Sequence, residues 1–260
     1  YSGPNETSLA GTYLNGFYEE SPLHYSEEQY GYAQKTQTML NVTDSKIIEL
    51  YLEDERFDLF TGEVLDYQRS LDLKQGILTR EVTWQSPQGK KVEIKIERLV
   101  SFSNKHLAAI NYQVTPLNFS GEIRIIPALD GEVTNNESAD VPRSSGDLAG
   151  QVLNLKEKII EDDFIALKQK VSNTEFDLVC GSKNELKTNN SYQLKTNTPD
   201  QKIEREYIMA AEKETAINLR KYISYFTSRD YEVDQLLGYT KENLALAAEK
   251  KFSGLKTEQH

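Results

Sequence analysis

The sequence predicts an all-β fold, an antiparallel β-sandwich followed by a C-terminal helix, and two observations predict it. Apolar and charged residues alternate strictly over residues 91–97, which is typical of a strand with one face in a core and the other in water. Short segments of this kind recur along the chain, with turn residues between them and no helical segment interposed. That order favours a sandwich or barrel over a parallel α/β sheet.

A hairpin is expected within residues 78–102. Val82 and Trp84 share one face of its first strand, and the alternation of its second strand continues to Phe102. The turn at residues 85–89 contains Pro and Gly, whose backbone preferences favour a reversal of the chain.

Ten other segments are expected to be strands, because each combines apolar, β-branched or aromatic residues with turn residues at its ends. They are residues 38–42, 47–52, 107–114, 123–129, 151–155, 164–171, 176–180, 192–195, 203–210 and 215–226. No repeat of fixed length relates these segments, which argues against a propeller or a solenoid.

Near the C-terminus the sequence favours helix, because Leu and Ala recur there among Glu and Lys. Either Ser228 or Asp230 is placed to cap this helix, and Gly238 is expected to bend it or to divide it in two. We therefore expect a β-sandwich domain over residues 1–227 and a helical linker over residues 228–260.

Composition excludes several classes of partner. The chain of 260 residues has a formal net charge of -11, which disfavours nucleic acid and anionic membranes. No apolar run approaches the ~20 residues that span a bilayer. Cys180 is the sole cysteine, so no intrachain disulfide can form and we expect a cytoplasmic setting. Its place within a strand pattern predicts a small buried residue rather than a nucleophile.

The motifs of common catalytic centres are missing. The three histidines are not spaced as metal ligands, and no phosphate loop, dinucleotide-binding motif or serine elbow occurs. We therefore expect no metal, no cofactor and no catalytic residue. Acidic clusters at residues 53–55 and 161–163 contain the carboxylates that glycoside chemistry needs, but such carboxylates need contrasting environments. Consecutive acids in a turn share one environment, so we expect two solvated turns.

Two segments have a more distinctive composition. Residues 11–20 place aromatic residues beside amides and glycines, which suits stacking on sugar rings and hydrogen bonding to hydroxyls. The alternative, which we favour, is a strand whose aromatic side chains enter the core. Residues 132–150 contain no aromatic residue and little periodicity. This segment is either a flap that reaches a ligand or a neighbouring domain, or a solvated excursion between strands.

Five segments, in their order and spacing, resemble the N-terminal domain of glycoside hydrolase family 65, which contains maltose, trehalose and kojibiose phosphorylases. They are residues 11–19, 37–42, 67–78, 98–102 and 128–135. The resemblance covers the first half of the chain, and beyond Gly150 it rests on the strand pattern and the terminal helix. Residues 37–42 depart from the asparagine-leucine-proline form common in maltose phosphorylases, which favours the kojibiose or trehalose branch.

The resemblance implies a super-β-sandwich of the galactose mutarotase-like or glucoamylase N-terminal type. In the family a helical linker leads from this domain to an (α/α)6 barrel, which holds the catalytic acid and the phosphate site. The chain would be a non-catalytic domain that supports and shapes the active site of this barrel. Its partners would be the barrel and, through the parent enzyme, an α-glucosyl disaccharide and inorganic phosphate. That parent would be an inverting disaccharide phosphorylase or, as the alternative, a related glycoside hydrolase.

The residues expected to face carbohydrate are Tyr13, Asn15, Tyr18, Asp130 and Asn135, which lie within the segments that carry the resemblance. Two other functions stay open. A stand-alone carbohydrate-binding module would need exposed, coplanar aromatic side chains. A docking module for another domain or subunit, including a homodimer, would need a surface patch less polar than its surroundings.

Overall fold

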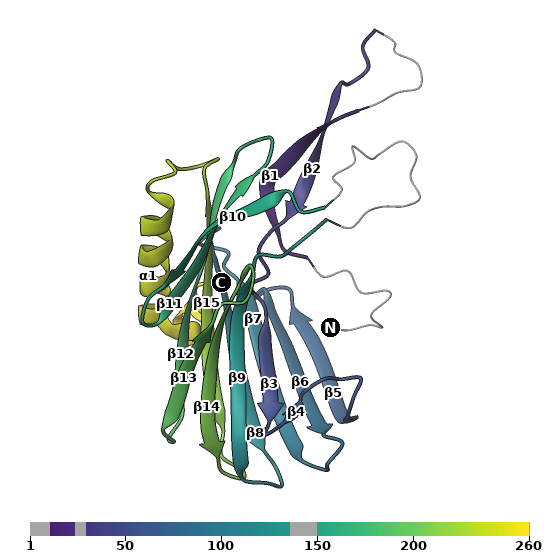
Figure 1. Ribbon diagram of the computed structural model, residues 1–260. Coiled ribbons are helices and arrows are strands. Elements are labelled where there is room, and N and C mark those ends of the chain that lie inside the picture. The colour runs from purple at the N-terminus through teal and green to yellow at the C-terminus, as the bar shows by residue number, and fades with distance from the viewer. Residues whose placement is uncertain (1–10, 24–29, 136–149, 260) are drawn as a thin grey trace.

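Two antiparallel sheets face one another across an apolar core, which confirms the predicted sandwich (Figure 1). The structure is a computed structural model and describes residues 11–23, 30–135 and 150–259. The large sheet has eight strands. In sheet order they are β10 (Leu153–Ile160), β11 (Phe164–Val171), β12 (Asp177–Lys187), β15 (Ile217–Thr227), β8 (Leu107–Pro116), β7 (Lys91–Val100), β6 (Ile77–Gln85) and β5 (Glu63–Asp72).

The small sheet has five strands, and a separate hairpin of two strands projects from one end of the sandwich (Figure 1). The small sheet contains, in sheet order, β13 (Tyr192–Asn197), β14 (Lys202–Ala211), β9 (Gly121–Asp130), β3 (Ile48–Leu52) and β4 (Glu55–Arg56). The projecting hairpin contains β1 (Tyr13–Pro22) and β2 (Lys35–Asn41).

The core follows from the period of two along the strands. On β7, Val92 and Ile94 are fully buried, whereas Glu93 between them is exposed. Trp84 on β6 is also fully buried, and its ring meets Phe57 edge-on with 5.3 Å between centroids. Each buried aliphatic side chain stabilises the fold by roughly 1.5–3 kcal/mol through its removal from water.

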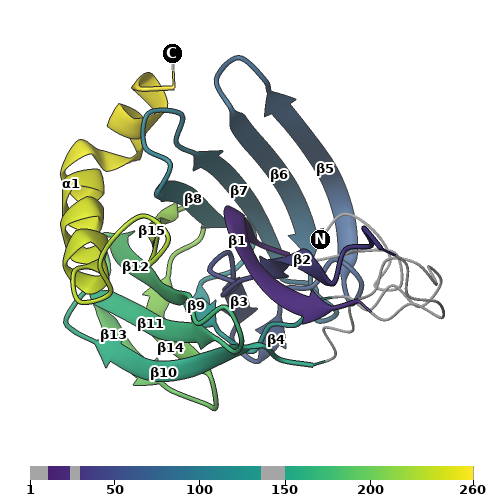
Figure 2. The same cartoon turned by 90° about the horizontal axis from the view of Figure 1, so that it is seen from above.

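Helix α1 (Leu236–Thr257) covers the outer face of the large sheet (Figures 1 and 2). Its apolar side chains, Leu244 and Phe252 among them, form a second buried cluster with residues of β8, β12 and β15. Gly181 on β12 allows this close packing, because a Cβ at that position would lie 2.4 Å from Cγ2 of Thr240. Among the described residues no helix is long and apolar enough to cross a membrane.

The predicted caps of this helix were wrong. The helix begins at Leu236, after Gln235, which makes no side-chain capping bond. The Ser228 hydroxyl instead accepts a hydrogen bond from the backbone amide of Asp177 at 2.9 Å. Asp230 forms an ion pair with Lys105 at 2.5 Å, so tertiary partners take both side chains.

The helix also bends at a different residue from the one expected. Gly238 stays helical, and the interruption lies at Lys251, whose φ and ψ are 60° and 167°. A glycine weakens a helix by about 1 kcal/mol relative to alanine, and the packing of α1 against the sheet outweighs that cost.

Strand β5 lies outside the expected set. It forms an edge of the large sheet, and all ten of its residues are exposed. Its ladder with β6, from Glu63 opposite Gln85 to Asp72 opposite Ile77, defines it as a strand. Sequence periodicity detects a strand through the burial of one face, and β5 has no buried face.

Candidate functional site

The expected carbohydrate-facing residues lie on or near the β1–β2 hairpin. Its ladder is irregular between Tyr13 and Tyr18, where Gly16 has a φ of 73° that favours glycine. Phe17, 1% exposed, enters the core, whereas Tyr13 is 51% exposed. The favoured interpretation of residues 11–20, a strand whose aromatics enter the core, is therefore confirmed for Phe17 and wrong for Tyr13.

One face of the Tyr18 ring is covered by Arg229. The guanidinium carbon lies 5.3 Å from the Tyr18 ring centroid and 5.4 Å from that of Phe176. The two rings meet edge-on at 5.4 Å, and Arg229 also donates a hydrogen bond to the carbonyl of Gly16. The contact joins the start of the helical segment to the hairpin and orients β1.

A buried carboxylate holds the same strand from its other side. Glu19 is fully buried and accepts hydrogen bonds from the backbone amides of Asn173 and Thr174, at 2.8 and 3.0 Å. Hydrogen bonds to an ionised acceptor are stronger than neutral ones, so this pair ties the hairpin to the turn after β11.

Asn135 completes the base of the hairpin. Its side-chain oxygen accepts from the amide of Asn41 at 2.8 Å, and its side-chain nitrogen donates to the carbonyl of Met39 at 2.8 Å. Asn41 in turn accepts from the amide of Thr12 and donates to the carbonyl of Thr134. Asn135 thus acts as a strand-like partner of β2. Most of the segment 132–150, namely residues 136–149, lies outside the described residues.

Asp130 is engaged within the sandwich. Its backbone exchanges two hydrogen bonds with Asp44, and its carboxylate pairs with Lys202 at 3.3 Å. Asp44 forms an ion pair with Lys46 at 2.7 Å, and Lys46 also donates to the hydroxyl of Thr12. These contacts link the end of β9 to the start of β1.

The structure therefore brings three of the five predicted residues to one place, which we call the hairpin base: Tyr13, Asp130 and Asn135, joined through Asn41 and residues 44–46. Tyr18 lies further along β1, and Asn15 is exposed with no side-chain hydrogen bond to any described residue. That these residues contact carbohydrate stays a prediction.

Substitution of Asn135 by Ala separates a structural role from a sugar-binding role. We expect it to lower the free energy of unfolding by about 1–3 kcal/mol, because an amide and a carbonyl of β2 lose their partner. Asn15→Ala, on the same hairpin, should leave stability unchanged. Urea unfolding followed by Trp84 fluorescence measures both. Equal stability of the two variants would contradict the role assigned to Asn135.

A polar network lies behind the hairpin base, inside the core, and no sequence signal identified it. The Tyr225 hydroxyl donates to the carbonyl of Thr43 at 2.8 Å and lies 2.5 Å from the hydroxyl of Ser45. The Thr43 hydroxyl donates to Gln169, which binds the carbonyl of Gly131 at 3.1 Å. The network holds the end of strand β9, which precedes Asn135 in the chain.

Lys221 is the most unusual member of this interior. Its side chain is fully buried, and Nζ donates to the carbonyls of Ile47 and Ala128 at 3.0 and 2.7 Å. Burial lowers the pKa of Lys221 to about 7. Cys180 is buried in the same core, as predicted, and burial raises the pKa of its thiol to about 12.

The first acidic cluster, residues 53–55, contacts the loop between β6 and β7. Burial raises the pKa of Glu55. Hydrogen bonds from Ser86, Gln88 and Lys90 outweigh that effect, so the pKa lies below its ordinary value. Glu53 pairs with Lys90 at 2.7 Å. Glu53 and Asp54 are exposed, as expected for a solvated turn, whereas the loop between β6 and β7 folds back onto Glu55 and binds it.

The second acidic cluster also forms ion pairs. Glu161 pairs with Lys241 of the helix and Asp163 pairs with Lys183, each at 2.5 Å. Both acids are more than half exposed, so these pairs contribute little to stability. Residues 161–163 therefore match the expected solvated turn.

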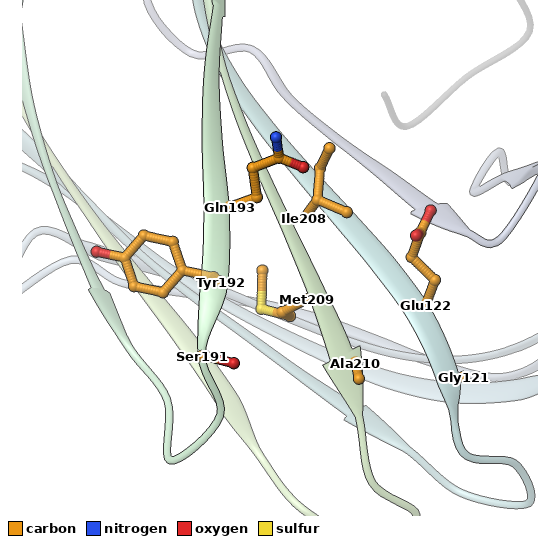
Figure 3. A pocket seen from close by; sticks show the side chains of 8 residues that line it. All are labelled: Gly121, Glu122, Ser191, Tyr192, Gln193, Ile208, Met209 and Ala210. Atoms are coloured by element: carbon orange, nitrogen blue, oxygen red, sulfur yellow. The ribbon is translucent and has the colours of Figure 1, made fainter.

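A shallow hollow of about 570 Å³ lies on strands β9, β13 and β14 (Figure 3). It contains one carboxylate, that of Glu122, and its aromatic side chain is Tyr192. The adjacent ring of Tyr207 is tilted by 57° to that of Tyr192 and is buried. The hollow therefore has no pair of coplanar exposed aromatics, and it lies away from the hairpin base.

No metal site is formed by the residues that the structure describes. Within residues 11–23, 30–135 and 150–259, no three His, Cys, Asp or Glu side chains gather closely enough to hold a metal ion. His106 is instead packed on Phe226, with ring centroids 4.0 Å apart, and its ring nitrogens contact the Tyr225 carbonyl and the Tyr231 hydroxyl.

Comparison with known proteins identifies the family. The family described as "Glycosyl hydrolase family 65, N-terminal domain" matches residues 2–260. The α,α-trehalose phosphorylase of Thermoanaerobacter brockii is 42% identical over 260 residues, which is 100% of this chain and 34% of that protein. The maltose phosphorylase of Bacillus subtilis is 27% identical over 263 residues, 98% of this chain and 32% of that protein.

A solved structure supports the fold. A putative kojibiose phosphorylase from the human microbiome superposes with a TM-score of 0.80 at 24% identity, covering 100% of this chain and 32% of that one. The chain thus spans about a third of the length of the phosphorylases it matches. These matches confirm the sandwich fold and the resemblance carried by the five short segments. The chain belongs to the N-terminal domain family of glycosyl hydrolase family 65.

Proposed function

We propose that this chain is the non-catalytic N-terminal domain of a disaccharide phosphorylase, and that it supports and shapes the active site of a catalytic barrel that follows helix α1. The observation that carries the proposal is the match of the whole chain to 34% of a trehalose phosphorylase at 42% identity. The remaining two-thirds of such a protein are long enough for a separate catalytic domain.

The reaction proposed for the parent enzyme is the phosphorolysis of an α-glucosyl disaccharide. An acid protonates the leaving oxygen while phosphate attacks the anomeric carbon from the opposite face, which inverts its configuration. Because phosphate is the nucleophile, a single protein acid suffices, and we place it in the barrel. A sandwich beside the barrel can still line the pocket, since ligand sites favour domain interfaces.

The state of the buried acids in this chain supports a non-catalytic role. Glu19 accepts hydrogen bonds from three backbone amides, and Glu206, 8% exposed, pairs with Arg124 at 3.2 Å. A glycosidic acid must hold a proton and deliver it to a leaving group. Both carboxylates are engaged by groups of this same chain, so both suit a structural role.

Activity assays test the proposal. We expect the 260-residue chain to release no glucose 1-phosphate from trehalose, kojibiose or maltose with inorganic phosphate, and the complete polypeptide that contains it to do so with at least one of them. Phosphate-dependent turnover by the purified chain alone would refute the non-catalytic role. A complete polypeptide inactive on all three sugars would refute the phosphorylase assignment.

One observation favours the docking role as part of this function. Three apolar side chains at one end of the large sheet, those of Leu71, Val100 and Phe102, are 56%, 63% and 62% exposed. A partner domain or a second copy of the chain would cover such side chains. A cytoplasmic setting remains part of the proposal, on the basis of the lone cysteine.

A further inference from the structure

Three arginines share the inner face of the large sheet near one end. Arg69 on β5 lies directly opposite Arg80 on β6. Arg98 on β7 lies opposite Leu78, which is two residues from Arg80 and therefore on the same face. Side chains directly opposite one another, such as those of Arg69 and Arg80, are about 4.5–5.5 Å apart at Cβ, and diagonal neighbours, such as Arg80 and Arg98, are about 7–8 Å apart.

This part of the inner face is open to solvent. Leu71 and Val100, which share the face with the arginines, are 56% and 63% exposed. Further along the same strands, Val82 and Ile94 are buried in the core. The arginines therefore lie where the sandwich core gives way to an open face.

Within the described part of the chain, the side chains of the three arginines form no hydrogen bond and no ion pair. Burial, with the positive charges of Arg80 and Arg69, lowers the pKa of Arg98. Arginine keeps its charge in proteins, so the direction of this shift means that the charged form is destabilised here. Asp44 acts in the opposite direction, but its carboxylate is paired with Lys46 at 2.7 Å.

A second unsatisfied group lies on the same cross-strand row. The row runs from Arg69 through Arg80 and Ile96 to Tyr112 on β8. The Tyr112 side chain is 3% exposed, and its hydroxyl has no hydrogen-bond partner among the described residues. A buried hydroxyl without a partner costs about 1–3 kcal/mol. The row thus carries both unpaired positive charge and a spare donor.

The end of the chain lies beside this face. Gln259, just after helix α1, accepts a hydrogen bond from the amide of Phe102 at 2.8 Å and donates to the carbonyl of Val100 at 3.1 Å. Figure 2 shows the C-terminal end near the turn that joins β7 to β8, on the side where β5 and β6 also turn. A domain that follows residue 260 would start at the rim of the arginine face.

We propose that Arg69, Arg80 and Arg98 form a site for a carboxylate side chain carried by the catalytic domain that follows this chain. This proposal rests on the proposed function and names the contact through which the two domains are held. Guanidinium forks match a carboxylate in geometry and can bind it with two hydrogen bonds each. Arginines with an apolar surround are also typical of the central part of a protein interface.

Thermal unfolding of two proteins, the 260-residue chain and the complete polypeptide, tests the site. In the complete polypeptide, Arg98→Met should lower the Tm of this domain by about 4 °C or more, because the carboxylate loses its partner. In the 260-residue chain the same change should leave Tm equal or raise it, because repulsion between arginines is relieved. Arg56→Met, which alters an exposed arginine of the small sheet, should have little effect in either protein.

Two results would overturn the proposal. An equal loss of Tm in both proteins would mean that the arginines serve the structure of this chain alone. A rise in the Tm of the 260-residue chain with millimolar inorganic phosphate, abolished by Arg98→Met, would assign the site to a dissolved ion. If Arg98→Met fails to fold, Arg69→Met, at the exposed edge strand, repeats the comparison. An absence of phosphorolysis in the complete polypeptide would refute the proposed function. The comparison of Tm values between the two proteins would still test the arginine site.

Discussion

Replacement of Lys221 by Met is expected to remove a pH dependence of stability that the parent chain shows between pH 7 and pH 10.5. Burial lowers the pKa of Lys221 from 10.5 to about 7. Between these values the unfolded chain binds one proton more than the folded chain. The free energy of unfolding of the parent therefore rises with pH in this window, and the stabilisation is lost as pH falls through 7.

The expected size follows from the same shift. One pKa unit corresponds to about 1.4 kcal/mol, so the difference in stability between parent and Lys221→Met should change by roughly 2–3 kcal/mol between about pH 7 and about pH 9. Neutral Lys221 has two N–H donors, which match its two carbonyl acceptors, those of Ile47 and Ala128. The neutral form is thus well accommodated.

Urea unfolding at several pH values measures this effect. Trp84 is fully buried and is the sole tryptophan, so its fluorescence reports unfolding of the core. Lys195→Met removes an exposed lysine on β13 and should keep the pH dependence of the parent. If Lys221→Met shows the same slope as Lys195→Met, Lys221 does not titrate in this window.

Introduction of a methyl group at Gly181 is expected to destabilise the contact between helix and sheet. A Cβ there would lie 2.4 Å from Cγ2 of Thr240, 3.1 Å from Phe164 and 3.2 Å from Leu244. Gly181→Ala should therefore lower the free energy of unfolding by about 1–3 kcal/mol, which is the usual cost of overpacking a core.

A second substitution identifies the cause. Thr240→Ser removes the methyl group that would clash and keeps the hydroxyl that donates to the carbonyl of Leu236 at 2.7 Å. We expect Thr240→Ser to restore part of the stability lost in Gly181→Ala, as a positive coupling in a double-mutant cycle. Gly238→Ala is the matched control, because nothing lies within 4 Å of the added Cβ. That change should be neutral or stabilising by up to about 1 kcal/mol.

Full stability of Gly181→Ala would mean that helix α1 does not approach the sheet as closely as described. The contact matters to the proposed function, because a catalytic barrel is proposed to follow this helix. Its docking on β12 sets the direction in which the chain leaves. Strand β15 ends at Thr227, and the division into a domain over residues 1–227 and a linker over residues 228–260 stays a prediction.

Several elements could be predicted because their cause is local. The alternation in β7 identified a strand with one buried face, and Val92 and Ile94 are buried as expected. Cys180 was correctly placed in the core for the same reason. The helix was predicted from composition, but its caps were not, since Ser228 and Asp230 bind partners more than fifty residues away in sequence.

The candidate site was predictable only in part. The resemblance pointed to Asp130 and Asn135, and the structure places both beside Tyr13 at the hairpin base. It also shows that Asn135 is bound to the backbone of β2 and that Asp130 is paired with Lys202. Composition describes which groups are present, whereas only the fold shows which of them are already satisfied.

By itself the sequence determined the fold class, most of the strands and the family, because a period of two and short ordered motifs are properties of neighbouring residues. Tertiary structure alone decided that Lys221 is buried, that β5 is an edge strand, and that Arg69, Arg80 and Arg98 meet on one face. The physical reason is strand register: it joins residues that lie far apart in the chain, and a shift of one residue would turn each side chain to the opposite face.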